Sequence, residues 1–221
     1  GAEDGHDFNI AIGSNALAVQ NAGADAYNIA IGHNAGTTVS TGVANTLIGG
    51  LAGDALDVGG ENVAIGTAAL TSDTKGSHST AVGRGALQVQ DFTSATDTNN
   101  TAVGYYAGAA ITSGQNNTCI GANSGDALTT GYLNTFVGSN AGSATDDGQS
   151  NTAVGAYALD AGNCGDDNVA IGAGALGDSS YTASKNVAMG KDAGNSLTVG
   201  ENNVAIGWNA LSSDDVGSRN V

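Results

Sequence analysis

Short apolar runs that end in glycine recur along the whole chain. Residues 28–32 read Asn-Ile-Ala-Ile-Gly and residues 151–155 read Asn-Thr-Ala-Val-Gly. A small residue, such as Ala35 or Ala158, follows three positions after each of these glycines. Alternation of β-branched with small residues favours a short strand that has one face inward. The pattern therefore predicts a series of short strands that are separated by tight turns.

The glycines that close these runs fall at a nearly fixed interval. Eight of the eleven spacings equal 17, and the others are 19, 21 and 18, for the series Gly13, Gly32, Gly49, Gly66, Gly83, Gly104, Gly121, Gly138, Gly155, Gly172, Gly190 and Gly207. Such a period is typical of a solenoid, in which each repeat stacks on its neighbours. We predict an all-β fold, a parallel β-solenoid of about twelve coils over residues 9–219. Residues 1–8 are interpreted as the end of a preceding coil, and residues 220–221 as the start of a further coil in a longer protein.

We number each coil from its asparagine, so that the invariant glycine is position 5. Position 1 is Asn in eleven coils and Ser79 in the other, which predicts a ladder of asparagine side chains that link successive coils. Positions 2 and 4 carry almost only Ile, Val or Thr, with Met189 as the exception, and we expect them to point into the coil. Position 5 is always Gly and position 15 is Gly in ten coils, which predicts two corners.

Two other positions predict how the interior of each coil is filled. Position 9 is Leu in six coils, and position 12 is then polar or Gly. In the other six coils position 9 is Gly, and position 12 is apolar in all of them except the coil of Thr145. We infer that each coil has one space in its interior, the core slot, which an apolar side chain fills from either position 9 or position 12. Only one of the two positions is large because both a void and an overfilled interior lower stability.

Position 3 is apolar in every coil, although it should point outward if positions 2 and 4 point inward. A strand that is apolar on both faces is expected to be buried on both faces. The sequence therefore predicts a homo-oligomer. Its inter-chain packing would use position 3 at Ala102, Cys119, Phe136 and Ala153.

The repeated unit resembles the head repeat of trimeric autotransporter adhesins of the YadA type, as in Val63-Ala64-Ile65-Gly66 followed by Ala69. Similar Asn-Thr-Ala-Ile-Gly repeats occur in bacteriophage tail fibres. The resemblance covers essentially the whole chain and implies a left-handed parallel β-roll, three copies about a long axis, and an extracellular place on a virion or cell surface. It implies a structural and adhesive role as the shaft or head of a fibre. The coil of the adhesin heads is shorter than the one found here.

Composition narrows the possible functions. The chain has 36 Gly, no Pro, 5% aromatic residues and a formal net charge of −16. So few large side chains predict a narrow interior. Nucleic acid and anionic membranes are disfavoured as partners, because their phosphates are recognised by clustered Lys and Arg. No apolar run is long enough to span a bilayer.

The sequence offers little catalytic chemistry. His6, His33 and His78 are far apart and have no repeated carboxylate or serine partner, so we expect no enzyme activity and no cofactor. Acidic pairs at residues 146–147, 166–167 and 214–215 could hold Ca²⁺, but we interpret them as solvated turns. The coil spacing places Cys119 and Cys164 about 12 Å apart, too far for a disulfide.

Surface recognition is expected at the variable positions 6 and 7, where exposed aromatic residues could contact a cell-surface glycan or protein. The candidates are Tyr105, Tyr106, Tyr157 and Trp208. The longest insertion, residues 90–99, is either a binding loop or a tolerated insertion. A file of threonines at position 2, Thr80, Thr101, Thr118, Thr135 and Thr152, is interpreted as stacking in the core rather than as an ice-binding face. A self-assembling filament, or a monomeric solenoid that binds ice or calcium, remains an alternative function.

Overall fold

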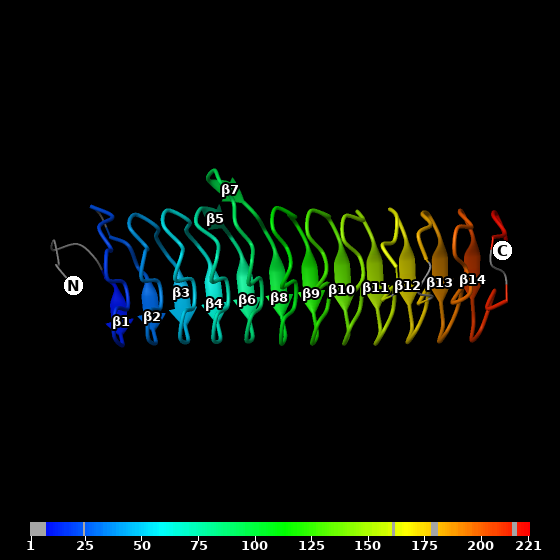
Figure 1. Ribbon diagram of the computed structural model, residues 1–221, viewed down its shortest axis with the longest axis horizontal. Helices are drawn as coiled ribbons and strands as arrows, with labels where there is room; N and C mark the ends of the chain where they lie inside the picture. Colours follow the sequence, from blue (N-terminus) through cyan, green and yellow to red (C-terminus); the bar gives the residue numbers. More distant parts are fainter. Residues whose placement is uncertain (1–7, 24, 161, 178–180, 214–215) are drawn as a thin grey trace.

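The computed structural model describes residues 8–23, 25–160, 162–177, 181–213 and 216–221, and these residues form a straight stack of coils (Figure 1). One parallel sheet of twelve three-residue strands runs along the rod in sequence order. Its strands are β1 (Ile10–Ile12), β2 (Ile29–Ile31), β3 (Thr46–Ile48), β4 (Val63–Ile65), β6 (Thr80–Val82), β8 (Thr101–Val103), β9 (Thr118–Ile120), β10 (Thr135–Val137), β11 (Thr152–Val154), β12 (Val169–Ile171), β13 (Val187–Met189) and β14 (Val204–Ile206). The predicted all-β solenoid with its 17-residue spacing is confirmed.

Equivalent positions of neighbouring coils lie directly opposite each other. Thr135 of β10, for example, pairs with Thr118 on one side and with Thr152 on the other. Positions 2, 3 and 4 of the repeat therefore each form a straight file of side chains along the rod.

The strands face the opposite way from the prediction. Position 3 is fully or almost fully buried in every strand except β1, whereas positions 2 and 4 are exposed or half-buried. Alternation along a strand guarantees that neighbouring side chains point to opposite faces, but it does not say which face is inside. The narrow interior accepts the small residue, usually Ala, and the β-branched residues lie outside.

The predicted core slot is confirmed and has a third contributor. Leu at position 9 and the apolar residues at position 12 are buried, with Leu211 partly so. The three large residues at position 3, Leu47, Cys119 and Phe136, all occur in coils with Gly at position 9. A Cβ on Gly142 would lie 2.6 Å from the Phe136 ring. Because this ring fills the slot, the coil of Phe136 can have the polar Thr145 at position 12.

A chain of hydrogen bonds from the asparagines at position 1 joins successive coils. The backbone N–H of Asn45 donates to Oδ1 of Asn28 at 2.8 Å, and Nδ2 of Asn45 donates to the carbonyl of Gly59 at 3.0 Å. The same pair of bonds recurs at Asn62, Asn117, Asn134, Asn151, Asn186 and Asn203. The predicted ladder is therefore present, but most of its bonds run from side chain to backbone.

The coils of irregular length insert a large polar side chain beside this ladder. In the first coil Gln20 Oε1 accepts from Asn28 Nδ2 at 2.9 Å. In the coil that begins with Ser79, the buried Gln90 donates to Ser79 Oγ at 2.8 Å and accepts from Asn100 Nδ2 at 2.8 Å. A serine is too short to replace asparagine, and Gln90 completes the ladder across this gap.

A third such side chain joins the ladder farther along the rod, in the coil of 18 residues. The buried Tyr181 hydroxyl donates to Asn168 Oδ1 at 2.6 Å and accepts from Asn186 Nδ2 at 3.0 Å. Extra residues in a coil therefore go together with an added polar group in the interior.

A small projection leaves the side of the rod. Strands β5 (Gly76–Ser77) and β7 (Thr96–Asp97) form a separate parallel pair, and β7 protrudes beyond the coils in Figure 1. Gln90, the first residue of the predicted insertion, points inward, so the projecting part begins after it.

The shared core slot can be tested by moving its occupant within one coil. Phe136→Ala should lower the free energy of unfolding by about 3–5 kcal/mol because it leaves a cavity. The double variant Phe136→Ala with Gly142→Leu should recover most of this loss, since it recreates the Ala153 and Leu159 pair of the next coil. Gly142→Leu alone should destabilise the chain through a clash with the ring. Urea unfolding of the four proteins measures the cycle, and additive losses in the double variant would contradict a shared slot.

The asparagine ladder predicts a large cost for removing one member. Asn117→Ala leaves the Asn134 N–H and the Gly131 carbonyl without their partners in a buried setting. Each orphaned group should cost about 1–3 kcal/mol. The exposed Ser139→Ala in the same region is the control and should change the unfolding midpoint little. Equal midpoints for the two variants would argue against the ladder as a main source of stability.

Candidate interaction surface

The outward side of the twelve-stranded sheet is a continuous apolar surface, which we call the strand face and define as positions 2 and 4 of β1–β4, β6 and β8–β14. Its residues are Ile, Val, Thr and Met189 only, so it carries no charge. Exposed members include Ile65, Val103, Ile120, Val154 and Met189, which are 36–40% exposed. Because contiguous exposed apolar surfaces are typical of interaction sites, the strand face is the candidate interaction surface.

The central part of the strand face contains the five successive threonines at position 2, Thr80 to Thr152. They are half-buried on the outside of the sheet and do not stack in the core as predicted. Their side chains alternate in each strand with Val or Ile at position 4. The threonines lie outside because position 3, and not position 2, faces the interior.

The same reversal overturns the predicted inter-chain residues. Ala102, Cys119, Phe136 and Ala153 have no exposed surface and belong to the core of their own coils. They cannot contact a second chain. The residues on either side of each of them in sequence, at positions 2 and 4, are the ones available for contact.

Positions 6 and 7 form a corner of the coil directly after the strand face. Two of the four predicted aromatic residues, Tyr105 and Tyr106, lie in contact there. The rings of Tyr105 and Tyr106 lie edge to face, with centroids 4.5 Å apart. The Arg84 guanidinium carbon lies 5.8 Å and 5.4 Å from the two ring centroids. Arg84 precedes Tyr105 in the file of position 6, so its place at the variable corner follows from the repeat, whereas its contact with the two rings does not. Tyr157 and Trp208 are exposed but lie in other coils, so the four aromatic residues do not form one site.

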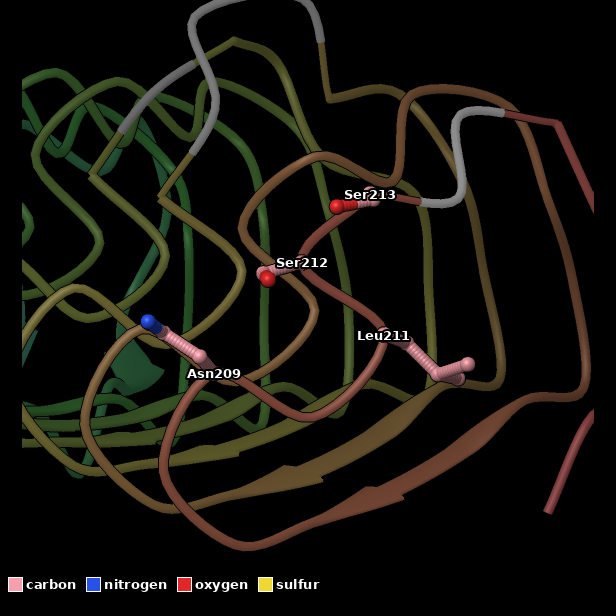
Figure 2. A pocket seen from close by; sticks show the side chains of 4 residues that line it. All are labelled: Asn209, Leu211, Ser212 and Ser213. Carbon is pink, nitrogen blue, oxygen red and sulfur yellow. The ribbon is translucent and has the colours of Figure 1, made fainter.

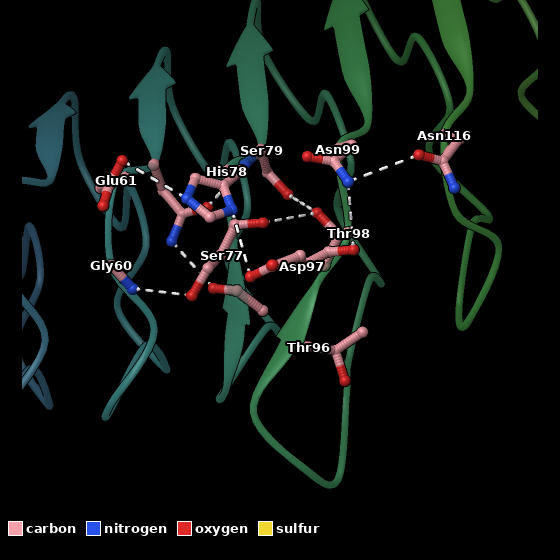
Figure 3. A network of polar contacts seen from close by, with 12 residues as sticks. Gly60, Glu61, Ser77, His78, Ser79, Thr96, Asp97, Thr98, Asn99 and Asn116 are labelled. Carbon is pink, nitrogen blue, oxygen red and sulfur yellow. Dashed lines mark hydrogen bonds and ion pairs between the residues drawn. The ribbon is translucent and has the colours of Figure 1, made fainter.

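Polar contacts fasten the projection to the rod, as Figure 3 shows. His78 Nε2 lies 3.3 Å from Glu61 Oε2, and His78 Nδ1 lies 3.2 Å from Asp97 Oδ1 of β7. Ser77 Oγ accepts from the Gly60 N–H at 3.1 Å. Because the two ring nitrogens of His78 contact different carboxylates, they do not converge on one reacting or metal-binding point. His33 is in another coil, and His6 lies outside the described residues.

The acidic turns considered for calcium have protein partners. Thr129 donates to the carboxylate of Asp146, Asn163 Nδ2 donates to Asp147 at 2.9 Å, and the Gln149 N–H donates to Asp166 at 2.9 Å. In the described ranges no three His, Cys, Asp or Glu side chains are grouped so that they could hold a metal ion. Residues 214–215, the third predicted pair, lie outside these ranges.

A shallow hollow at the last coil is lined by Asn209, Leu211, Ser212 and Ser213 (Figure 2). None of these side chains titrates near neutral pH, and the figure shows them spread around the hollow rather than directed at one point. The described residues contain no helix long and apolar enough to cross a membrane.

The two cysteines are free and buried, which predicts low reactivity. Burial raises the pKa of Cys119 to about 12 and that of Cys164 to about 11. Because the thiolate is the nucleophile, neither thiol should react with Ellman's reagent at pH 8 in the folded protein. Both should react at once in denaturant. Rapid labelling of the native protein would contradict the buried placement of the two thiols.

Comparison with models of protein families, with curated proteins and with solved structures finds no match to this chain. The geometry of the described residues is therefore the basis on which a function is proposed.

Proposed function

We propose that this chain is a structural rod segment of an extracellular fibre and that copies of it associate through the strand face. The observation that carries the proposal is the strand face itself, an uncharged apolar surface that continues over all twelve strands. The rod would form the shaft or head of a phage tail fibre or surface adhesin and would present or form a region that binds the host surface.

The regular spacing of the strand face supports a second copy as its partner. Neighbouring strands of the strand face are about 4.8 Å apart. A second copy has the same spacing between strands, so its side chains can pack against the strand face along the whole rod. An unrelated globular protein would contact only a few strands. Burial of β-branched side chains against their equivalents then stabilises the complex by about 25 cal/mol for each Å² of apolar surface removed from water.

The distribution of charge also supports association at this surface. All 21 acidic residues lie outside the strand face, although the chain has a net charge of −16. Copies that meet at the strand face keep their acidic turns in water and apart from one another. Three copies is the number that the resemblance to trimeric adhesin heads and tail-fibre repeats implies.

One observation favours a second function. The threonine file and its β-branched neighbours are on the outside, in register on successive strands, and such a regular surface could bind ice if the chain remains a monomer. A third arrangement, a filament of rods stacked end to end, would leave the strand face exposed. Solution mass separates these alternatives from lateral association.

The first test is solution mass by light scattering over a range of protein concentrations. We expect a discrete mass near three times 21.3 kDa that EDTA does not change. Growth into polydisperse species would favour the filament. A stable 21.3 kDa monomer would overturn association through the strand face, and thermal hysteresis of that monomer would then support ice binding.

Substitutions on the strand face should separate the copies without unfolding the rod. Val103→Glu with Val154→Glu places charges at two exposed positions of the strand face. We expect monomeric mass with an unchanged circular dichroism spectrum, because a carboxylate buried between copies is strongly unfavourable. Val58→Glu is the control, since Val58 is 40% exposed on a different turn of the coil. If the control dissociates equally, the contact surface lies elsewhere.

A further inference from the structure

We infer that Arg84, Tyr105 and Tyr106 form a binding platform for a carboxylate-bearing sugar. The platform lies on the corner that follows the strand face, and it consists of a guanidinium group beside two perpendicular tyrosine rings. This inference concerns a ligand rather than the association of copies, so it does not depend on the proposed oligomer.

The platform is held in place before any ligand arrives. The Tyr106 ring packs directly on Gly85, where an added Cβ would come within 2.5 Å of the ring. Tyr105 is set edge to face against this fixed ring. Arg84 Nη1 donates to the Tyr105 hydroxyl at 3.3 Å, so the guanidinium is tied to the exposed ring. Pre-organised aromatic and guanidinium groups lose little conformational entropy on binding.

Arg84 is available to an anion although the protein is strongly acidic. Within the described residues Arg84 forms no ion pair, while Lys191, the other cation at position 6, pairs with Asp192 at 2.5 Å. Asp192 is also the single acidic residue among positions 6 and 7 of the twelve coils. The corner is therefore locally free of the negative charge that dominates the other turns, and the remaining N–H donors of Arg84 keep their capacity for a ligand oxygen.

These groups match one class of ligand better than others. A guanidinium can hold a carboxylate through two parallel hydrogen bonds. Tyr105 is 49% exposed, and its ring offers an apolar face for the C–H face of a pyranose, while its hydroxyl can bond to a sugar hydroxyl. A polyphosphate or nucleic acid would need several clustered cations, which this acidic chain does not provide. A single carboxylate on a sugar ring therefore fits the single guanidinium beside an aromatic ring.

The test uses the whole chain and two acidic probes, trigalacturonate and sialyllactose, each compared with its neutral methyl ester. Binding is followed by saturation-transfer NMR and by calorimetric titration. We expect at least one acidic probe to bind with its saturation transfer concentrated on the sugar protons near the carboxylate. The corresponding ester should bind at least about tenfold more weakly, because it loses the charge-assisted bonds.

Matched variants locate the site. Arg84→Gln and Tyr105→Ala should each weaken binding about tenfold or more. Arg84→Lys should weaken binding nearly as much as Arg84→Gln, because an ammonium group cannot form the two parallel hydrogen bonds of a planar guanidinium. Lys191→Gln and Tyr157→Ala are the controls, since they remove a cation and an exposed tyrosine from the same corner in other coils. Solution mass measured on all variants shows whether association is unaffected.

Three outcomes would overturn the inference. Absence of binding by either acidic probe at millimolar concentration would remove the platform as a sugar site. Equal binding of the acid and its ester would show that the carboxylate is not recognised. Equal losses in the Lys191→Gln or Tyr157→Ala controls would place the binding elsewhere on the corner. None of these results would alter the expected mass of the complex, so the structural proposal is judged separately.

Discussion

The buried asparagine at position 1 makes the two hydrogen bonds on which the stack depends. Its Oδ1 accepts the backbone N–H of the next asparagine, and its Nδ2 donates across the coil to the carbonyl at position 15. One side chain therefore closes its own coil and joins it to the next. In an interior that is mostly Ala, each unmade bond would lower stability strongly, because these polar groups are buried and few apolar contacts compensate. This constraint explains why the coil of Ser79 contains Gln90 in the interior and why Tyr181 lies beside Asn168.

The narrow interior imposes the second constraint, a fixed volume in each coil. Leu at position 9 exchanges with an apolar residue at position 12, and a large residue at position 3 occurs only where position 9 is Gly, because the Leu side chain would occupy the same space. The coil of Phe136 has Gly142 at position 9 and Thr145 at position 12 for this reason, and Thr145 bonds to Cys164 Sγ at 3.1 Å instead of filling the slot. With the interior occupied by small residues, the β-branched side chains remain outside and create the strand face.

Three surfaces with different chemistry result from this arrangement. The strand face is apolar and uncharged, the corner after it has almost no acidic residues, and the remaining turns carry nearly all of the negative charge. This separation allows copies to pack at one surface, a ligand to bind at the corner, and water to solvate the acidic turns. The projection held by His78 between Glu61 and Asp97 adds a local feature without interrupting the sheet.

The sequence by itself determined the parallel solenoid, its 17-residue spacing, the asparagine ladder and the exchange of Leu at position 9 with an apolar residue at position 12. These features repeat in most coils, and periodicity in sequence becomes periodicity in space when coils stack. Only the tertiary structure decided that position 3 points inward, because alternation along a strand leaves the choice of face open until the coil closes around its interior. The pairing of Leu47, Cys119 and Phe136 with Gly at position 9 was the available signal. The meeting of Arg84 with Tyr105 and Tyr106 likewise required the structure, since residues one coil apart become neighbours only when the coils are in register.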